Sequence, residues 1–158
     1  MKSHNIILLV YSGFELLDLS GPVSVFSNAN ELRKIAPYKI IVVSISGGLV
    51  ESDSSIEVST ISTKSVNISD TDSILVVGGN YSAISTASAN KAIQLWLKKV
   101  CTQTVRFGSI CSGAFVLAAA NLLENRACTT HWAGTKMLQK MHPTINVQPE
   151  SLYVIDKD

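Results

Sequence analysis

The chain has 158 residues, of which 46% are hydrophobic and 16% are charged. This size and composition predict one compact domain over residues 1–158, with a core of its own. Thirteen basic against twelve acidic residues give a net charge of +1, without a basic run, which argues against a surface that grips nucleic acid, so any DNA contact would need a separate domain.

The first predicted element is a buried parallel strand over residues 6–11, where apolar and β-branched residues follow one another. This run is too short for the core of a signal peptide, and the apolar residues 113–123 are too few to span a membrane. We therefore expect a cytoplasmic protein that makes no membrane contact.

A helix is predicted next. Ser20 can cap it and Pro22 can open it, while Arg33, Lys34 and Pro37 are typical of a helix end. One face of this helix is expected to carry four apolar residues, Val25, Ala29, Leu32 and Ala36.

Three more strands are predicted at Tyr38–Ile45, Ile74–Val77 and Val105–Ile110. Residues 46–70 are rich in Ser, Thr and Gly and predict a hairpin or an irregular excursion. Residues 90–103 predict a helix with an apolar stripe of Ile93, Trp96, Leu97 and Val100. This alternation of strands and helices predicts an open α/β sheet with right-handed crossovers.

Cys111 stands where the last of these strands meets an apolar helix. The residues two positions before and after it, Ser109 and Gly113, are small, as a sharp strand-to-helix turn requires. The amides at the start of the helix favour a thiolate, so we expect a lowered thiol pKa. The alternative is a buried cysteine without a function. The small-x-Cys-x-small spacing favours the functional thiol.

The last part of the chain predicts short elements. Residues 127–131 are extended, and a helix that Pro143 stops carries Met137, Leu138 and Met141. Two small strands are expected at the end of the chain, at Ile145–Val147 and Leu152–Ile155.

The three cysteines, Cys101, Cys111 and Cys128, show neither a C-x-x-C motif nor the paired spacing of metal ligands. We therefore expect reduced thiols, no metal site and no cofactor.

Three loops are expected to meet at the carboxyl edge of the sheet: the one after the first strand, the turn at residues 78–80, and the Cys111 turn. The amides of the double glycine and of Ser112 predict an oxyanion-type pocket facing Cys111. The alternative is a plain tight turn. The candidate ligand-binding residues are Gly78, Gly79, Asn80 and Gly113.

Two more side chains complete the predicted site. Asp18 follows the first strand and can share a proton with the sulfur, although it can equally cap a helix. His131 can orient or deprotonate the thiol or accept a ligand hydrogen bond, although it can equally pack beside Trp132. The candidate catalytic residues are Cys111, Asp18, Ser112 and His131.

These segments resemble a known family. Residues 14–26, the turn at 76–79 and above all residues 108–132 look like the ThiJ/PfpI branch of the class I glutamine amidotransferase-like superfamily. Within that branch they resemble isonitrile hydratases and the N-terminal domains of AraC-type (GlxA-like) transcriptional regulators. The resemblance covers residues 5–158.

The resemblance implies a flavodoxin-like three-layer sandwich with a mostly parallel sheet and a cysteine nucleophile elbow. It implies that Cys111 is the reactive centre, with Asp18 as its acidic neighbour and His131 as the family histidine. Ser112 departs from PfpI-type proteases, which carry histidine there, and therefore argues against a Cys-His protease. The family continues with a strand and a helix after residues 152–155, so we expect a domain truncated at its C-terminus.

The tail after His131 resembles the regulators more than the hydratases. We therefore expect a ligand-sensing, oligomerisation domain of an AraC-family regulator. Its expected partners are an unknown small molecule and a second copy of the chain, with DNA bound through a further domain. The alternatives are an isonitrile hydratase-like lyase and a thiol-based stress-response protein.

Overall fold

The computed structural model describes residues 4–33, 37–69 and 72–156. Its central six-stranded sheet has the order β3-β4-β2-β1-β5-β6. The strands are β1 (His4–Leu9), β2 (Tyr38–Ser44), β3 (Gly48–Glu51), β4 (Glu57–Ser62), β5 (Ser73–Val76) and β6 (Arg106–Ser109). Neighbours pair in parallel except β3 and β4, which are antiparallel. The four predicted apolar strands are confirmed, and the predicted excursion contains a hairpin.

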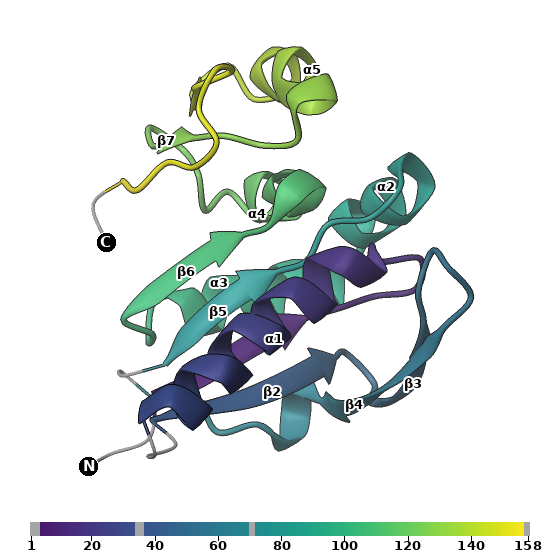
Figure 1. Ribbon diagram of the computed structural model, residues 1–158. Coiled ribbons are helices and arrows are strands. Elements are labelled where there is room, and N and C mark those ends of the chain that lie inside the picture. The colour runs from purple at the N-terminus through teal and green to yellow at the C-terminus, as the bar shows by residue number, and fades with distance from the viewer. Residues whose placement is uncertain (1–3, 34–36, 70–71, 157–158) are drawn as a thin grey trace.

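Helices cover both faces of this sheet, as Figure 1 shows for α1 in front and α3 behind. The helices are α1 (Leu16–Arg33), α2 (Tyr81–Ala89), α3 (Lys91–Cys101), α4 (Ala114–Ala119) and α5 (Thr135–Met141). Three single turns of 3-10 helix join them: η1 (Thr63–Ser65), η2 (Cys111–Gly113) and η3 (Trp132–Gly134). The mostly parallel sheet between helical layers is the predicted flavodoxin-like sandwich.

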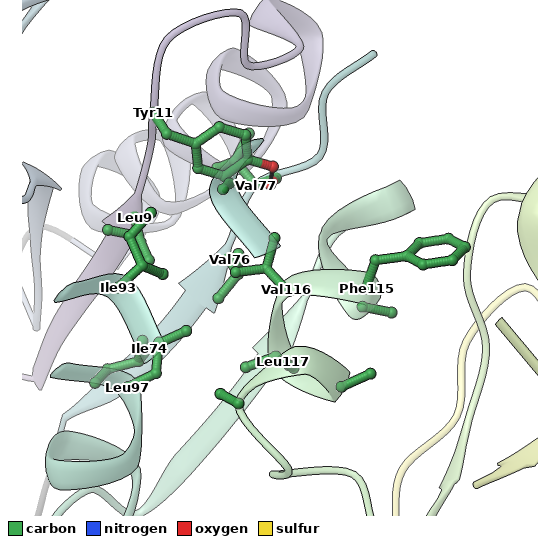
Figure 2. Close-up of a cluster of buried hydrophobic side chains, with 14 of the residues drawn as sticks. Leu9, Tyr11, Ile74, Val76, Val77, Ile93, Leu97, Phe115, Val116 and Leu117 are labelled. Atoms are coloured by element: carbon green, nitrogen blue, oxygen red, sulfur yellow. Dashed lines mark hydrogen bonds between the residues drawn. The ribbon is translucent and has the colours of Figure 1, made fainter. Parts of the chain in front are cut away.

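The core lies between the sheet and the helices α3 and α4. Ile74 and Val76 of β5 are fully buried, as is Leu97 of α3. Figure 2 shows these side chains facing Val116 and Leu117 of α4. Continuous apolar runs form these inner strands because both faces of a parallel sheet are covered.

The strand β1 lies at the centre of the sheet, with β2 on one side and β5 on the other. The chain passes from β1 through α1 on one face, and from β5 through α2 and α3 on the other (Figure 1). Loops that leave in opposite directions open a crevice at the carboxyl edge of the strands, where open α/β sheets bind ligands. The fold therefore brings the three predicted loops to a common edge.

The start of α1 differs from the prediction. The helix begins at Leu16, four residues before Ser20, because Asp53 Oδ1 in the β3–β4 hairpin accepts the Leu16 N–H at 3.1 Å. Pro22 lies inside the helix and has no N–H for the carbonyl of Asp18, its partner in regular helical geometry. A cap supplied by a distant hairpin leaves no mark in the local sequence.

The predicted buried face of α1 is also wrong. Val25 and Leu32 are 64% and 85% exposed, and Ala36 lies outside the described residues. Instead Leu19 is buried, and Phe26 packs on the core with its ring centroid 5.1 Å from that of Tyr38. Apolar residues occur around most of this helix, so their spacing did not select the inner face.

The helix α2 was not predicted, because the predicted helix covered only residues 90–103. Asn90 joins the two helices, because its N–H bonds to Ala87 at the end of α2 while its Oδ1 accepts two N–H groups at the start of α3. The predicted apolar stripe of the second helix is confirmed, with Ile93, Leu97 and Val100 buried.

The C-terminal part adds a two-stranded sheet in which β7 (Ala127–Cys128) pairs in parallel with β8 (Asn146–Val147). The helix α5 ends at Met141, as the position of Pro143 predicts. The predicted strand at Leu152–Ile155 is wrong, because these residues are irregular and Leu152 is 99% exposed.

Candidate functional site

Cys111 begins η2 directly after β6 and Ile110, and its φ of +52° lies in the left-handed region. Such a conformation costs a non-glycine residue about 1–3 kcal/mol and persists where the surroundings fix it. Three hydrogen bonds do so: Gly113 N–H to Ile110 O at 2.9 Å, Ile110 N–H to Val76 O at 2.9 Å, and Thr130 Oγ1 to Cys111 O at 3.0 Å. The thiol therefore occupies a strained strand-to-helix turn.

Gly113 makes this turn possible by packing against β5. A Cβ at this position would lie 3.0 Å from the Val76 carbonyl carbon, 3.1 Å from Val77 O, and still closer to Val76 O. Gly113 is buried, and it contacts backbone where a ligand would need space. Gly113 therefore packs the turn against β5, and its role in ligand binding stays a prediction.

Asp18 lies in the first turn of α1, and its carboxyl contacts the Cys111 thiol and the Gly78 N–H. Burial raises the pKa of Asp18 above its usual value, and these contacts and the charge of His131 only partly offset the increase. Among the described residues, the buried Asp18 Oδ2 has no hydrogen bond of ordinary geometry. The structure thus places a poorly satisfied carboxyl beside the sulfur.

The Cys111 pKa is raised, and the predicted lowering is wrong. Burial is the main cause and the Asp18 charge the next, and the Ser112 N–H and hydroxyl only partly oppose them. Asp18 makes the thiol harder to ionise, whereas the hydrogen bond from the thiol favours the charged form of Asp18 and only partly offsets the effect of burial. The two groups therefore hold their protons to higher pH than an exposed carboxyl and an exposed thiol would.

The turn after β5 is clamped by the chain's own groups. Ser112 Oγ accepts the Gly79 N–H at 3.0 Å and donates to the Gly79 carbonyl at 2.8 Å. The Gly78 N–H faces Asp18, and the Gly78 carbonyl accepts the Glu15 N–H at 2.8 Å. Two of the three amides of the predicted oxyanion pocket, those of Gly78 and Gly79, therefore already have partners within the chain, and the Ser112 N–H contacts the Cys111 sulfur.

The double glycine is nevertheless required by close approach. A Cβ at Gly78 would collide with Asp18 Oδ2 and would lie 3.0 Å from Ser112 Oγ and 3.1 Å from Cys111 Cβ. Gly78 thus lets the carboxyl, the hydroxyl and the thiol converge on one backbone position.

Two predicted residues lie at the margin of the site. Asn80 is exposed, and its side chain caps α2 by accepting the Ala83 N–H at 3.0 Å. His131 is exposed, its Nδ1 accepts the Ala133 N–H at 3.3 Å, and its ring centroid lies 5.3 Å from that of Trp132. His131 lowers the pKa of Asp18 through its charge.

Two residues of the site were missed. Tyr11 is buried at the end of the first apolar run, and its hydroxyl donates to Val77 O at 2.6 Å. Thr130, next to His131, donates to the Cys111 carbonyl. A polar side chain at the carboxyl end of a buried strand was the available signal for both.

A groove of about 840 Å³ runs from Cys111 along β6, between residues 126–132 and 149–156. Its floor includes Leu75 and Phe107, and the Arg126 guanidinium lies 5.2 Å from the Phe107 ring centroid. Cys111 therefore lines a mixed apolar and polar space large enough for a small molecule.

The part of the chain that the structure describes holds no group of three or more His, Cys, Asp or Glu placed to bind a metal ion. Within the same residues, no helix is both long enough and apolar enough to cross a membrane.

A protein in the cpoL 5′ region of Streptomyces lividans is 38% identical over 89% of this chain and 96% of its own length. The HTH-type transcriptional regulator GlxA of Rhizobium meliloti is 30% identical over 94% of this chain, which spans 44% of that regulator. A ThiJ/PfpI family protein from Pseudomonas syringae has a TM-score of 0.83 at 25% identity, over 99% of this chain and 61% of that one.

Residues 4–158 match the DJ-1/PfpI family throughout. The chain therefore belongs to the DJ-1/PfpI family.

Proposed function

We propose that this chain is a ligand-sensing and oligomerisation domain of an AraC-family transcriptional regulator, whose DNA-binding domain is a separate unit. Similarity to the regulator GlxA over less than half of that protein's length supports a domain that works with another. The net charge of +1 supports a division in which DNA is bound elsewhere.

The observation that carries this proposal is the unsatisfied Asp18 Oδ2 beside the Cys111 thiol. A buried polar atom without a full partner has the most to gain from a ligand that donates a hydrogen bond. The raised pKa of Cys111 keeps the sulfur protonated, and the thiol is a poor nucleophile. Both features favour binding a small molecule over covalent catalysis.

The exposed face of α1 supports oligomerisation through a second copy of the chain. Leu17, Val25 and Leu32 are 71%, 64% and 85% exposed and lie within one angular sector of the helix. Gly21 lies between Leu17 and Val25 on this face of α1, and a Cβ there would meet nothing within 4 Å. The exposed face therefore alternates large apolar side chains with a position that has no side chain. Two antiparallel copies of such a stripe complement each other.

Ligand binding is tested with a fragment library of small amides, amines and alcohols, read by the amide resonances of Gly78 and Ser112. We expect hits that move these resonances in the wild type and lose binding in Asp18→Ala, with Asn28→Ala, an exposed change on the same helix, as the matched control. Hits that bind equally well to Asp18→Ala would contradict the proposal.

Oligomerisation is tested by sedimentation velocity. Val25→Asp is expected to shift a dimer to monomer, whereas Leu95→Asp, which replaces a side chain 68% exposed on α3, leaves the dimer intact. A wild-type chain that stays monomeric at high concentration rejects this part of the proposal.

The contact between Asp18 and Cys111 favours one second candidate, an isonitrile hydratase-like lyase. In that reaction Cys111 attacks or protonates the isocyanide carbon, and Asp18 handles the proton and activates water, so that R–NC and H2O give the formamide R–NH–CHO. Ser112 would help to position the substrate in that reaction, with its hydroxyl held by the N–H and the carbonyl of Gly79. Formation of formamide from an alkyl isocyanide, abolished in Cys111→Ala, would establish this activity, and its absence at saturating isocyanide would exclude it.

A further inference from the structure

Tyr11 is buried where the chain leaves β1, and its ring lies among apolar side chains, with 8% of its surface exposed. Its hydroxyl donates a short hydrogen bond of 2.6 Å to the Val77 carbonyl. Figure 2 shows the Tyr11 ring with its oxygen directed at Val77. The bond joins the loop after β1 to the turn after β5, across two of the loops that form the candidate site.

The Val77 carbonyl and the Gly78 N–H belong to one peptide group. In a planar trans peptide these two groups point in opposite directions, and the described part of the chain has no cis peptide bonds. Tyr11 holds the oxygen side of this peptide, and the N–H side faces the Asp18 carboxyl. Fixing one side of the plane therefore fixes the direction of the other.

The remaining groups of the turn do not replace this contact. Glu15 N–H bonds to the Gly78 carbonyl, and Ser112 Oγ bonds to both backbone groups of Gly79. These bonds hold the next two peptides and leave the orientation of the Val77–Gly78 peptide to Tyr11. A hydrogen bond to a carbonyl also polarises its peptide, which makes the N–H a better donor.

We propose that Tyr11 is a positioning residue for the Cys111–Asp18 pair: its hydroxyl holds the Val77–Gly78 peptide so that the Gly78 N–H stays directed at the Asp18 carboxyl. The inference rests on the proposed function only in taking this pair as the functional site.

Several charged or titratable groups act on the Asp18 carboxyl from neighbouring elements. They come from the loop after β1, the β3–β4 hairpin, the turn after β6 and the segment before η3: Tyr11, Glu15, Asp53, Cys111 and His131. Replacing Tyr11 by phenylalanine leaves the other four in place. The Tyr11 phenol is uncharged in the pH range where a carboxyl titrates, so a change in the titration of Asp18 then reports the peptide contact.

The test is an NMR titration of the Asp18 carboxyl carbon in the wild type and in Tyr11→Phe. We expect the midpoint to move upward in Tyr11→Phe, because the carboxylate loses the N–H that favours its charged form. We also expect the Gly78 amide proton to move upfield as its contact with the Asp18 carboxyl weakens. Tyr81→Phe, at a tyrosine that is 76% exposed on α2, is the matched control and should change neither signal.

A purely structural role for Tyr11 would lower stability and leave the titration unchanged, so a folded Tyr11→Phe with an unchanged Asp18 midpoint overturns the inference. The wild type supplies a second measurement that needs no variant: the Val77 carbonyl carbon and the Gly78 amide proton must both follow the Asp18 titration. If they stay fixed, the inference is also overturned. Neither measurement involves a ligand, so a failed fragment screen beside a shifted midpoint rejects the proposed function alone.

Discussion

Gly113→Ala tests whether the turn at Cys111 depends on contact with β5. The added Cβ would lie 3.0 Å from the Val76 carbonyl carbon and 3.1 Å from the Val77 oxygen, with Val76 O nearer still. All three are backbone atoms at the end of β5 and directly after it, so no flexible side chain can move aside. Overpacking of this kind costs about 1–3 kcal/mol, and the rigidity of these atoms places Gly113→Ala at the upper end of that range.

The free energy of unfolding is measured by urea titration, followed by tryptophan fluorescence and by circular dichroism. For a chain of 158 residues, a loss of about 3 kcal/mol lowers the melting temperature by about 6–12 °C. Gly21→Ala is the matched control, because a Cβ there meets nothing within 4 Å inside α1. Alanine favours the helix, so this variant should gain about 0.5–1 kcal/mol.

The two glycines should thus respond to the same substitution with opposite signs. We also expect Gly113→Ala to change the alkylation rate of Cys111, because the turn must shift to make room for the methyl group. If Gly113→Ala unfolds at the wild-type urea concentration with an unchanged slope, the close packing of the turn on β5 is refuted.

Three further predictions concern the site and the helices. Asp18→Asn removes a charge that raises the Cys111 pKa, so iodoacetamide should alkylate the thiol faster at neutral pH. The plot of alkylation rate against pH should shift to lower pH, and an unchanged plot would contradict the effect of Asp18 on the thiol. Peroxide should oxidise Cys111 before Cys101 and Cys128, because burial raises the pKa of those two thiols to about 12 and about 11. Mass spectrometry measures the oxidation of each cysteine, and equal oxidation of all three would count against this order. Asn90→Ala leaves two N–H groups of α3 without their cap and should cost about 1 kcal/mol in urea unfolding, whereas a loss below 0.3 kcal/mol would argue against the cap.

Local sequence patterns predicted the steric features of the site. The spacing of Ser109, Cys111 and Gly113 predicts a tight strand-to-helix turn, and the structure has Cys111 at a φ of +52° between β6 and α4. The double glycine after a buried strand predicts a close backbone approach, and Gly78 does lie where a Cβ would meet three side chains of the site. Steric demands on neighbouring residues are local, so the sequence carries them directly.

The thiol pKa and the amide contacts of the site, in contrast, differ from what the local sequence predicts. The helix start after Cys111 predicts a lowered pKa, but burial and the charge of Asp18, 93 positions earlier in the chain, raise it. The amides of Gly78 and Gly79 predict an oxyanion pocket, but Asp18 and Ser112 already occupy them. Both differences come from partners that only folding brings within reach.

The sequence by itself determined the four parallel strands, their alternation with helices, and the meeting of three loops at one sheet edge. These features depend on apolar runs, on glycine positions and on the rule that parallel strands end on the same side. Only the tertiary structure decided that α1 begins at Leu16 under a cap from Asp53, and that Asp18 faces Cys111. Contacts between residues far apart in the chain have no periodicity of their own, and they set both the burial and the charge that each group of the site feels.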